Sequence, residues 1–137
     1  MVALGLVVAQ FNKERPITHE MDDCALEAAD EAEDAEVVET IEVPGAYDAP
    51  LAADRLARRD DIDAVVVLGA IITGDTDHDR VIADAAAQGL TDVSLNRDTP
   101  VALGIIGPGM SQAEAEERIE YGATAVESAI SLAEELQ

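Results

Sequence analysis

Residues 64–70 read Ala-Val-Val-Val-Leu-Gly-Ala, an apolar run without a single polar position. A continuous run of this length is typical of a strand in a parallel sheet that is covered on both faces. Similar runs occupy residues 2–8 and 101–106, and a more mixed one occupies residues 36–43. We expect four strands, with the mixed one at an edge of the sheet.

Helical patterns alternate with these runs. Pro50 favours a helix start, and Ser111 with Glu114 has the spacing of a capping box. The predicted helices cover residues 18–33, 50–59, 77–96 and 111–136. The order β-α-β-α-β-α-β-α predicts an α/β fold, a single domain over residues 1–137 with an open four-stranded parallel sheet and helices on both faces.

The composition excludes several classes of partner. The 137 residues are 48% hydrophobic, which is enough for a core, and Asp plus Glu number 30 against 8 Lys plus Arg. The formal net charge of −22 argues against a nucleic-acid partner and against an anionic membrane surface. No apolar run approaches the ~20 residues that span a bilayer.

The cysteine and lysine counts indicate the environment. Cys24 is the only cysteine, and no basic segment precedes the first apolar run, so we expect a cytoplasmic protein. Lys13 is the only lysine. So acidic a globular chain favours a salt-rich cytoplasm, where salt screens the self-repulsion, and an ordinary acidic surface is the alternative.

Ligands of open parallel sheets bind at the carboxyl ends of the strands, so the residues after each strand are candidates. Gln10-Phe11-Asn12 follows the first strand. Phe11 either stacks on a flat ligand or folds back onto the core. Val43-Pro-Gly-Ala-Tyr-Asp-Ala-Pro50 follows the second strand, where Asp48 either caps the next helix or accepts hydrogen bonds from ligand hydroxyls.

The segment after the third strand is the most informative. It reads Gly69-Ala-Ile-Ile-Thr-Gly-Asp-Thr-Asp-His78. Asp75 and Thr76 precede a predicted helix, whose free N–H groups and positive end form an anion site. His78 in the first turn can transfer protons near neutral pH, and a solvated surface histidine is the alternative.

After the fourth strand we expect a turn at Gly107-Pro-Gly-Met110. Arg118 then lies two turns into the last predicted helix, where it either binds an oxyanion or pairs with Glu114. The chain has no CxxC, HExxH, GxGxxG or Walker A motif, so neither metal nor nucleotide-triphosphate chemistry has support.

Taken together, these segments resemble one known family over essentially the whole chain. The matching segments are Gln10-Phe11-Asn12, Val43-Pro-Gly-Ala-Tyr-Asp48, Gly69 to His78, Pro100-Val-Ala-Leu-Gly-Ile and Glu117-Arg118. They are similar to 6,7-dimethyl-8-ribityllumazine synthases, and Gly-Pro-Gly-Met with Glu-Arg-Ile-Glu-Tyr-Gly122 resembles the archaeal branch. The resemblance implies a flavodoxin-like three-layer α/β/α fold.

It also implies the penultimate step of riboflavin biosynthesis. In that step, 5-amino-6-(D-ribitylamino)uracil condenses with 3,4-dihydroxy-2-butanone 4-phosphate to give the lumazine, phosphate and water. No cofactor is required. The family assembles as pentamers, often twelve in an icosahedral shell of 60 subunits, with active sites between neighbouring subunits.

The resemblance assigns a role to each matching position. His78 transfers protons, and Asp75, Thr76 and Arg118 bind the phosphate. The pyrimidine and its ribityl chain contact Phe11, Asn12, Ala46, Tyr47, Asp48, Ala70, Ile71, Ile72 and Leu103, with Leu103 coming from a neighbouring subunit.

Three positions depart from many relatives: Thr73 replaces a basic residue, Leu103 an aromatic residue and Asp48 a glutamate. Two alternatives also stay open. An archaeal-type riboflavin synthase would dismutate two lumazines without releasing phosphate. A non-catalytic flavin- or lumazine-binding shell protein would need neither His78 nor Arg118.

Overall fold

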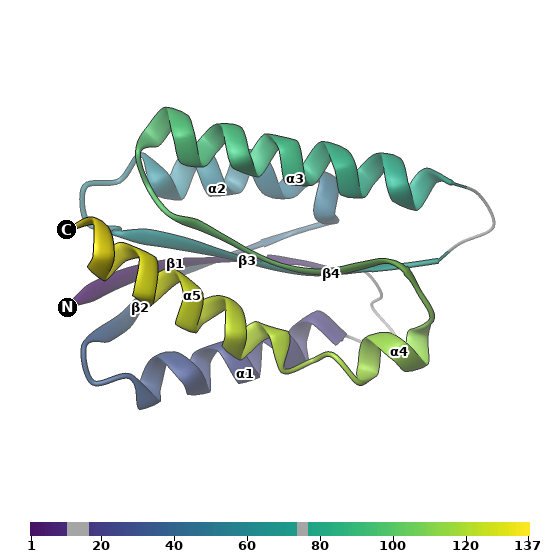
Figure 1. Cartoon of the computed structure of the whole chain (residues 1–137), viewed down its shortest axis with the longest axis horizontal. Coiled ribbons are helices and arrows are strands. Elements are labelled where there is room, and N and C mark those ends of the chain that lie inside the picture. Colours follow the sequence, from purple (N-terminus) through teal and green to yellow (C-terminus); the bar gives the residue numbers. More distant parts are fainter. Residues whose placement is uncertain (11–16, 74–76) are drawn as a thin grey trace.

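Four parallel strands form the centre of the molecule (Figure 1). The computed structural model describes residues 1–10, 17–73 and 77–137. The strands are β1 (Val2–Ala9), β2 (Ala35–Val43), β3 (Ala64–Ile72) and β4 (Val101–Met110), in the spatial order β2-β1-β3-β4. The predicted parallel sheet and the edge position of the mixed strand are confirmed.

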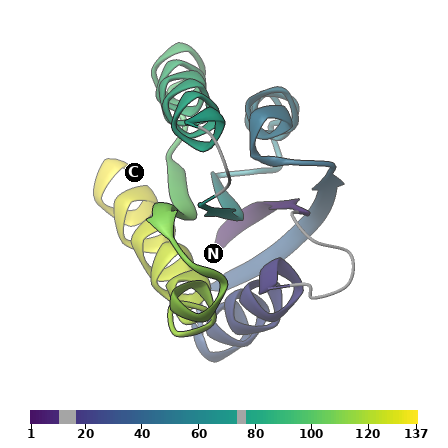
Figure 2. The ribbon, with the colours of Figure 1, turned by 90° about the vertical axis from the view of Figure 1, so that its right-hand side faces the viewer.

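Helices cover both faces of this sheet, as expected for strands without a polar side. Figure 2 shows α2 and α3 on one face, and α1, α4 and α5 on the other. The helical elements are α1 (Ile17–Glu31), the 3₁₀ turn η1 (Ala46–Asp48), α2 (Ala49–Ala57), α3 (His78–Arg97), α4 (Gln112–Glu116) and α5 (Tyr121–Leu136). None of the described helices is long and apolar enough to cross a membrane.

Successive residues of the central strands build two cores. Leu4, Leu6 and Val8 of β1 pack under α1 and α5, together with Val66 and Leu68 of β3. On the opposite face, alternate residues of the same strands pack against α2 and α3. All five named side chains are at most 1% exposed, so they anchor β1 and β3 in the core.

The prediction of one helix over residues 111–136 is wrong, because two helices, α4 and α5, occupy this segment. The Ser111–Glu114 capping box is confirmed, since Glu114 N donates to Ser111 Oγ and Ser111 N to Glu114 Oε1, both at 3.2 Å. However, α4 ends at Glu116, and tight turns follow it, with Tyr121 N donating to Arg118 O at 3.0 Å. Arg118 therefore lies between two helices rather than within one.

The turn predicted at Gly107-Pro-Gly-Met110 is also wrong. β4 continues through these residues after an irregularity in its pairing with β3, and Met110 pairs with Ile72. Gly107 adopts a φ of 92°, and an added Cβ there would overlap the carbonyl oxygen of Ile71. A glycine is therefore needed where β4 bends past β3.

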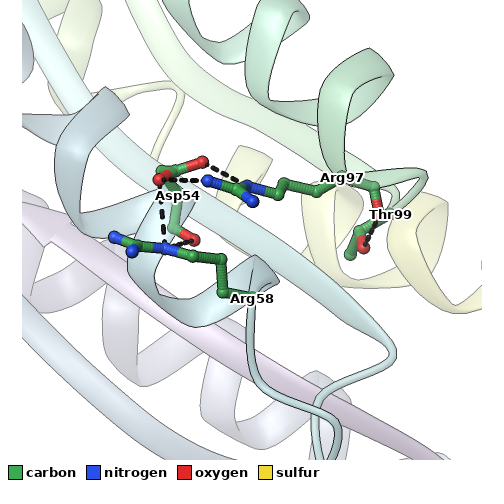
Figure 3. A network of polar contacts seen from close by, with 4 residues as sticks. All are labelled: Asp54, Arg58, Arg97 and Thr99. Atoms are coloured by element: carbon green, nitrogen blue, oxygen red, sulfur yellow. Dashed lines mark hydrogen bonds and ion pairs between the residues drawn. The ribbon is translucent and has the colours of Figure 1, made fainter.

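An arginine network joins α2 and α3 at the end opposite to the helix starts (Figure 3). Arg97 donates from Nε to Asp54 Oδ1 at 2.8 Å and from Nη2 to Asp54 Oδ2 at 3.2 Å. Arg58 Nε lies 3.2 Å from the same Oδ2. The hydrogen bonds from Arg97 hold the pKa of Asp54 below its ordinary value. This network fixes the two helices whose other ends border the candidate site.

Candidate active site

A cavity of about 540 Å³ lies at the carboxyl ends of β1, β2 and β3. The segments that follow these strands line it, together with the first turn of α3. The lining residues are Ala9, Gln10, Pro44, Gly45, Ala46, Tyr47, Asp48, Ala70, Ile71, Ile72, Thr73, His78, Asp79 and Ile82. The position agrees with the rule that ligands of open α/β sheets bind beyond the strand ends.

Seven of the predicted site residues share this cavity. Three come from the 3₁₀ turn after β2, three from the end of β3 and one from the start of α3: Ala46, Tyr47, Asp48, Ala70, Ile71, Ile72 and His78. Parallel pairing brings them together, because β1 lies between β2 and β3 and aligns their ends. Their contacts with substrates stay predictions.

The polar groups of the cavity come mainly from two elements. Asp48 is the N-cap residue of α2, yet its side chain makes no capping hydrogen bond, which disfavours the alternative reading of this residue. Tyr47 is 66% exposed. His78 begins α3, and the side chain of the N-cap residue, Asp77, makes no capping hydrogen bond. The start of a long helix presents backbone N–H groups and the positive end of the helix dipole, which are suited to an anion.

Four predicted site residues, Phe11, Asn12, Asp75 and Thr76, lie outside the described residues. Two others, Arg118 and Leu103, are described but do not line the cavity. Arg118 Nη1 donates to the carbonyl oxygen of Glu114 at 2.9 Å and lies 3.9 Å from its carboxylate, so the predicted alternative pairing is present. Leu103 lies on the edge strand β4 and is 55% exposed.

The predicted set missed several lining residues. Gln10, Thr73, Asp79 and Ile82 were assigned no role, although each is close in sequence to a predicted position. Helical spacing identifies Ile82, which follows His78 by four residues. The side-chain partners of Gln10 have no sequence signal, because they come from β2 and α1.

The described residues contain no group of three or more His, Cys, Asp or Glu side chains that could hold a metal ion. The polar side chains that line the described cavity are two carboxylates, a phenol, an amide, an imidazole and the hydroxyl of Thr73. These groups can accept hydrogen bonds from a polar ligand, and the imidazole can move protons.

Fold and cavity together define an α/β protein of the open parallel-sheet type that binds a small polar ligand at the strand ends. The family model for 6,7-dimethyl-8-ribityllumazine synthase matches residues 1–137. The chain belongs to the 6,7-dimethyl-8-ribityllumazine synthase family.

Curated relatives of that name match the chain over nearly its full length. The protein of Halobacterium salinarum is 68% identical over 99% of this chain and 100% of its own length. That of Halorubrum lacusprofundi is 65% identical over 99% of both chains. The relative from Methanococcus aeolicus is 49% identical over 99% of this chain and 98% of its own length. The first two come from halophilic archaea.

Proposed function

We propose that this chain is the enzyme that forms 6,7-dimethyl-8-ribityllumazine in riboflavin biosynthesis. The observation that supports this most strongly is the full-length match to the family, which includes a relative that is 68% identical. Its substrates are 5-amino-6-(D-ribitylamino)uracil and 3,4-dihydroxy-2-butanone 4-phosphate. An amine of the pyrimidine adds to the ketone, water leaves to give an imine, phosphate is eliminated, and the ring closes with loss of a second water.

The turn after β2 and the end of β3, which form two sides of the cavity, would contact different parts of the pyrimidine substrate. Ala46, Tyr47 and Asp48 would hold the pyrimidine and the ribityl chain, while Ala70, Ile71 and Ile72 would border the ring. Phe11 would stack on the pyrimidine and Asn12 would bind beside it. Holding the amine and the ketone in contact accounts for much of the rate enhancement in such condensations.

The phosphate would bind at the start of α3. Asp75 and Thr76 would offer backbone N–H groups and a hydroxyl there, next to His78. His78, which lines the cavity at the first turn of α3, would exchange protons with the reacting amine and the leaving groups. Anion stabilisation at this point helps both binding and the departure of phosphate.

A neighbouring subunit would complete the site. Among the described residues that line the cavity there is no lysine or arginine, although one substrate carries a phosphate. Leu103 is exposed, as are Val81 and Leu95 of α3, at 62% and 75%. We infer that the α3–β4 side packs against a second copy, which supplies Arg118, in a pentamer or a shell of 60 subunits.

The activity is tested by mixing the purified chain with both substrates in molar potassium chloride. One phosphate released per lumazine formed is expected. No turnover by folded protein, or lumazine consumption without phosphate release, would exclude the proposed reaction. Arg118→Gln should raise KM for the butanone phosphate about tenfold, because hydrogen bonds to charged groups are the stronger ones, while an unchanged KM would remove this role.

The shared site is tested by complementation. His78→Ala and Arg118→Gln are each unfolded, mixed in equal amounts and refolded together. If His78 and Arg118 of one site come from different subunits, about a quarter of the sites regain both residues. No gain over the two variants alone would place both residues in one chain.

A further inference from the structure

Gln10 connects the candidate site to two side chains outside it. It follows β1, lines the cavity, and its backbone N–H donates to the carbonyl oxygen of Val43 at 2.9 Å. Its Nε2 donates to Glu42 Oε2 at 2.7 Å and lies 3.3 Å from His19 Nε2. Three elements, β1, β2 and α1, therefore meet at this amide.

These contacts decide which way the amide faces. An ionised carboxylate only accepts hydrogen bonds, so the NH₂ end of Gln10 must face Glu42. The carbonyl oxygen is then the opposite end of the amide. In the part of the chain that the structure describes, no group donates a hydrogen bond to this oxygen. Gln10, which lines the cavity, thus has an oriented amide whose oxygen is available as an acceptor.

We propose that Gln10 determines specificity in the lumazine synthase reaction by accepting a hydrogen bond from an N–H or O–H group of the pyrimidine substrate, and that Glu42 is the positioning residue that fixes its amide. The inference rests on the proposed function. It adds a contact at a position to which the resemblance assigns no role.

The chemistry of the two substrates favours the pyrimidine. This substrate presents ring N–H groups, amines and a chain of hydroxyls, all of which donate hydrogen bonds. Gln10 extends from β1, which pairs with β2, and β2 leads into the turn with Tyr47 and Asp48. The phosphate position at the start of α3 lies after β3, on the other side of β1. An acceptor at Gln10 therefore complements the ligand expected on the β2 side.

The burial of the partners supports a positioning role for Glu42. Its side chain is 57% exposed and does not line the cavity, so any effect of Glu42 on a ligand there must act through Gln10. His19 is 47% exposed, and its Nε2 lies 3.8 Å from Glu42 Oε1. The shorter of the two contacts of this amide is the charge-assisted hydrogen bond to Glu42, which we take as the main one that orients it.

The experiment compares four variants of the full-length protein: Gln10→Ala, Glu42→Ala, Glu42→Gln and Glu36→Ala. Glu42→Gln keeps an oxygen that can accept from Gln10. Glu36→Ala is the matched control, because Glu36 is also exposed on β2 and its loss changes the net charge equally. Steady-state kinetics with each substrate varied, and calorimetric binding of the pyrimidine alone, are measured in molar potassium chloride.

Gln10→Ala and Glu42→Ala should raise KM for the pyrimidine and weaken its binding about five- to tenfold, the effect of one hydrogen bond. KM for the butanone phosphate should stay near the wild-type value, and Glu42→Gln and Glu36→Ala should behave like wild type. Unchanged pyrimidine binding by folded Gln10→Ala would overturn the inference, and so would equal losses in Glu42→Ala and Glu42→Gln. Failure of the proposed function is distinct, since wild-type protein would then show no turnover.

Discussion

Replacing Gly122 by alanine should change the stability of the fold in two opposite ways, through a gain in helix propensity and a loss in packing. Gly122 is the second residue of α5 and is buried where this helix crosses α1. A Cβ added there would lie 3.0 Å from the carbonyl carbon of Met21 and would overlap its oxygen. Since the obstacle is backbone and Met21 is fully buried, no side-chain rotation can relieve the overlap.

The magnitude follows from two opposed terms. Carbon atoms pack best at about 3.5–4.0 Å, so α1 and α5 must separate by at least about 0.5 Å. Overpacking of this kind costs about 1–3 kcal/mol, and a backbone obstacle places the cost near the upper end. Alanine in a helix gains at most about 1 kcal/mol over glycine. We expect Gly122→Ala to lose about 2 kcal/mol of unfolding free energy.

Urea unfolding followed by far-ultraviolet circular dichroism measures this loss. The protein concentration and the molar potassium chloride are held constant, because association adds to apparent stability. With a typical urea slope, the midpoint should fall by about 1 M. Thr124→Ala, exposed two residues further along α5, should stay within about 0.5 kcal/mol of wild type. A Gly122→Ala midpoint at or above the wild-type value would refute the packing argument.

Three further outcomes are expected. His78→Ala should lower kcat by about 10²-fold or more with little change in KM, because positioning of the substrates remains, and a wild-type kcat would contradict its role in proton transfer. The hydrogen bonds from Arg97 lower the pKa of Asp54 below 3.8, so the pair stabilises the fold fully above that pH and less as the pH falls through the lowered pKa. The urea midpoints of wild type and Asp54→Asn should therefore differ at neutral pH and converge as the pH falls through the lowered pKa, whereas a constant difference would exclude the pair as its cause. Raising potassium chloride from about 0.1 M to about 1 M shortens the screening length from about 10 Å to about 3 Å and should raise both the unfolding midpoint and kcat/KM, while salt-independent values would contradict the interpretation of the net charge.

The sheet could be predicted from the sequence because burial on both faces leaves a local signal. Every residue of β3 before Ile72 is buried, and the run is uniformly apolar. β2 has no buried residue, and its mixed sequence of apolar and polar residues predicted the edge position. In both cases the signal lies in consecutive residues and needs no knowledge of distant partners.

The two wrong predictions, the turn at residues 107–110 and the single last helix, concern features that depend on backbone hydrogen bonds and not on the pattern of consecutive residues. Gly107, Pro108 and Gly109 are typical of a turn, yet Thr73 N donates to the carbonyl oxygen of Met110 at 2.8 Å and keeps this segment in the sheet. The break after α4 occurs within an apolar helical period that continues through Ile119 and Gly122. The spacing of apolar residues in the sequence indicates which residues face the core, but it does not indicate where the backbone hydrogen bonding of a helix breaks.

The same distinction, between local signals and distant contacts, separates the site residues that could be predicted from those that could not. Residues adjacent to strand ends, such as Tyr47 and His78, could be predicted because topology alone brings strand ends together. The pairing of Gln10 with Glu42 could not, because it depends on side-chain reach between two strands. The orientation of Arg118 depends equally on the unforeseen turn between α4 and α5.

The charge distribution links the assembly to the chemistry. Arg58, Arg59 and Arg97 lie at the ends of α2 and α3 remote from the cavity, and each pairs with a carboxylate of its own chain. The described cavity wall instead contributes the carboxylates of Asp48 and Asp79. In a chain of net charge −22, an anionic substrate is then repelled at long range and attracted only by groups close to its phosphate. If the nearest arginine belongs to a neighbouring subunit, dissociation removes that attraction, so conditions that screen charge and hold subunits together should also favour catalysis.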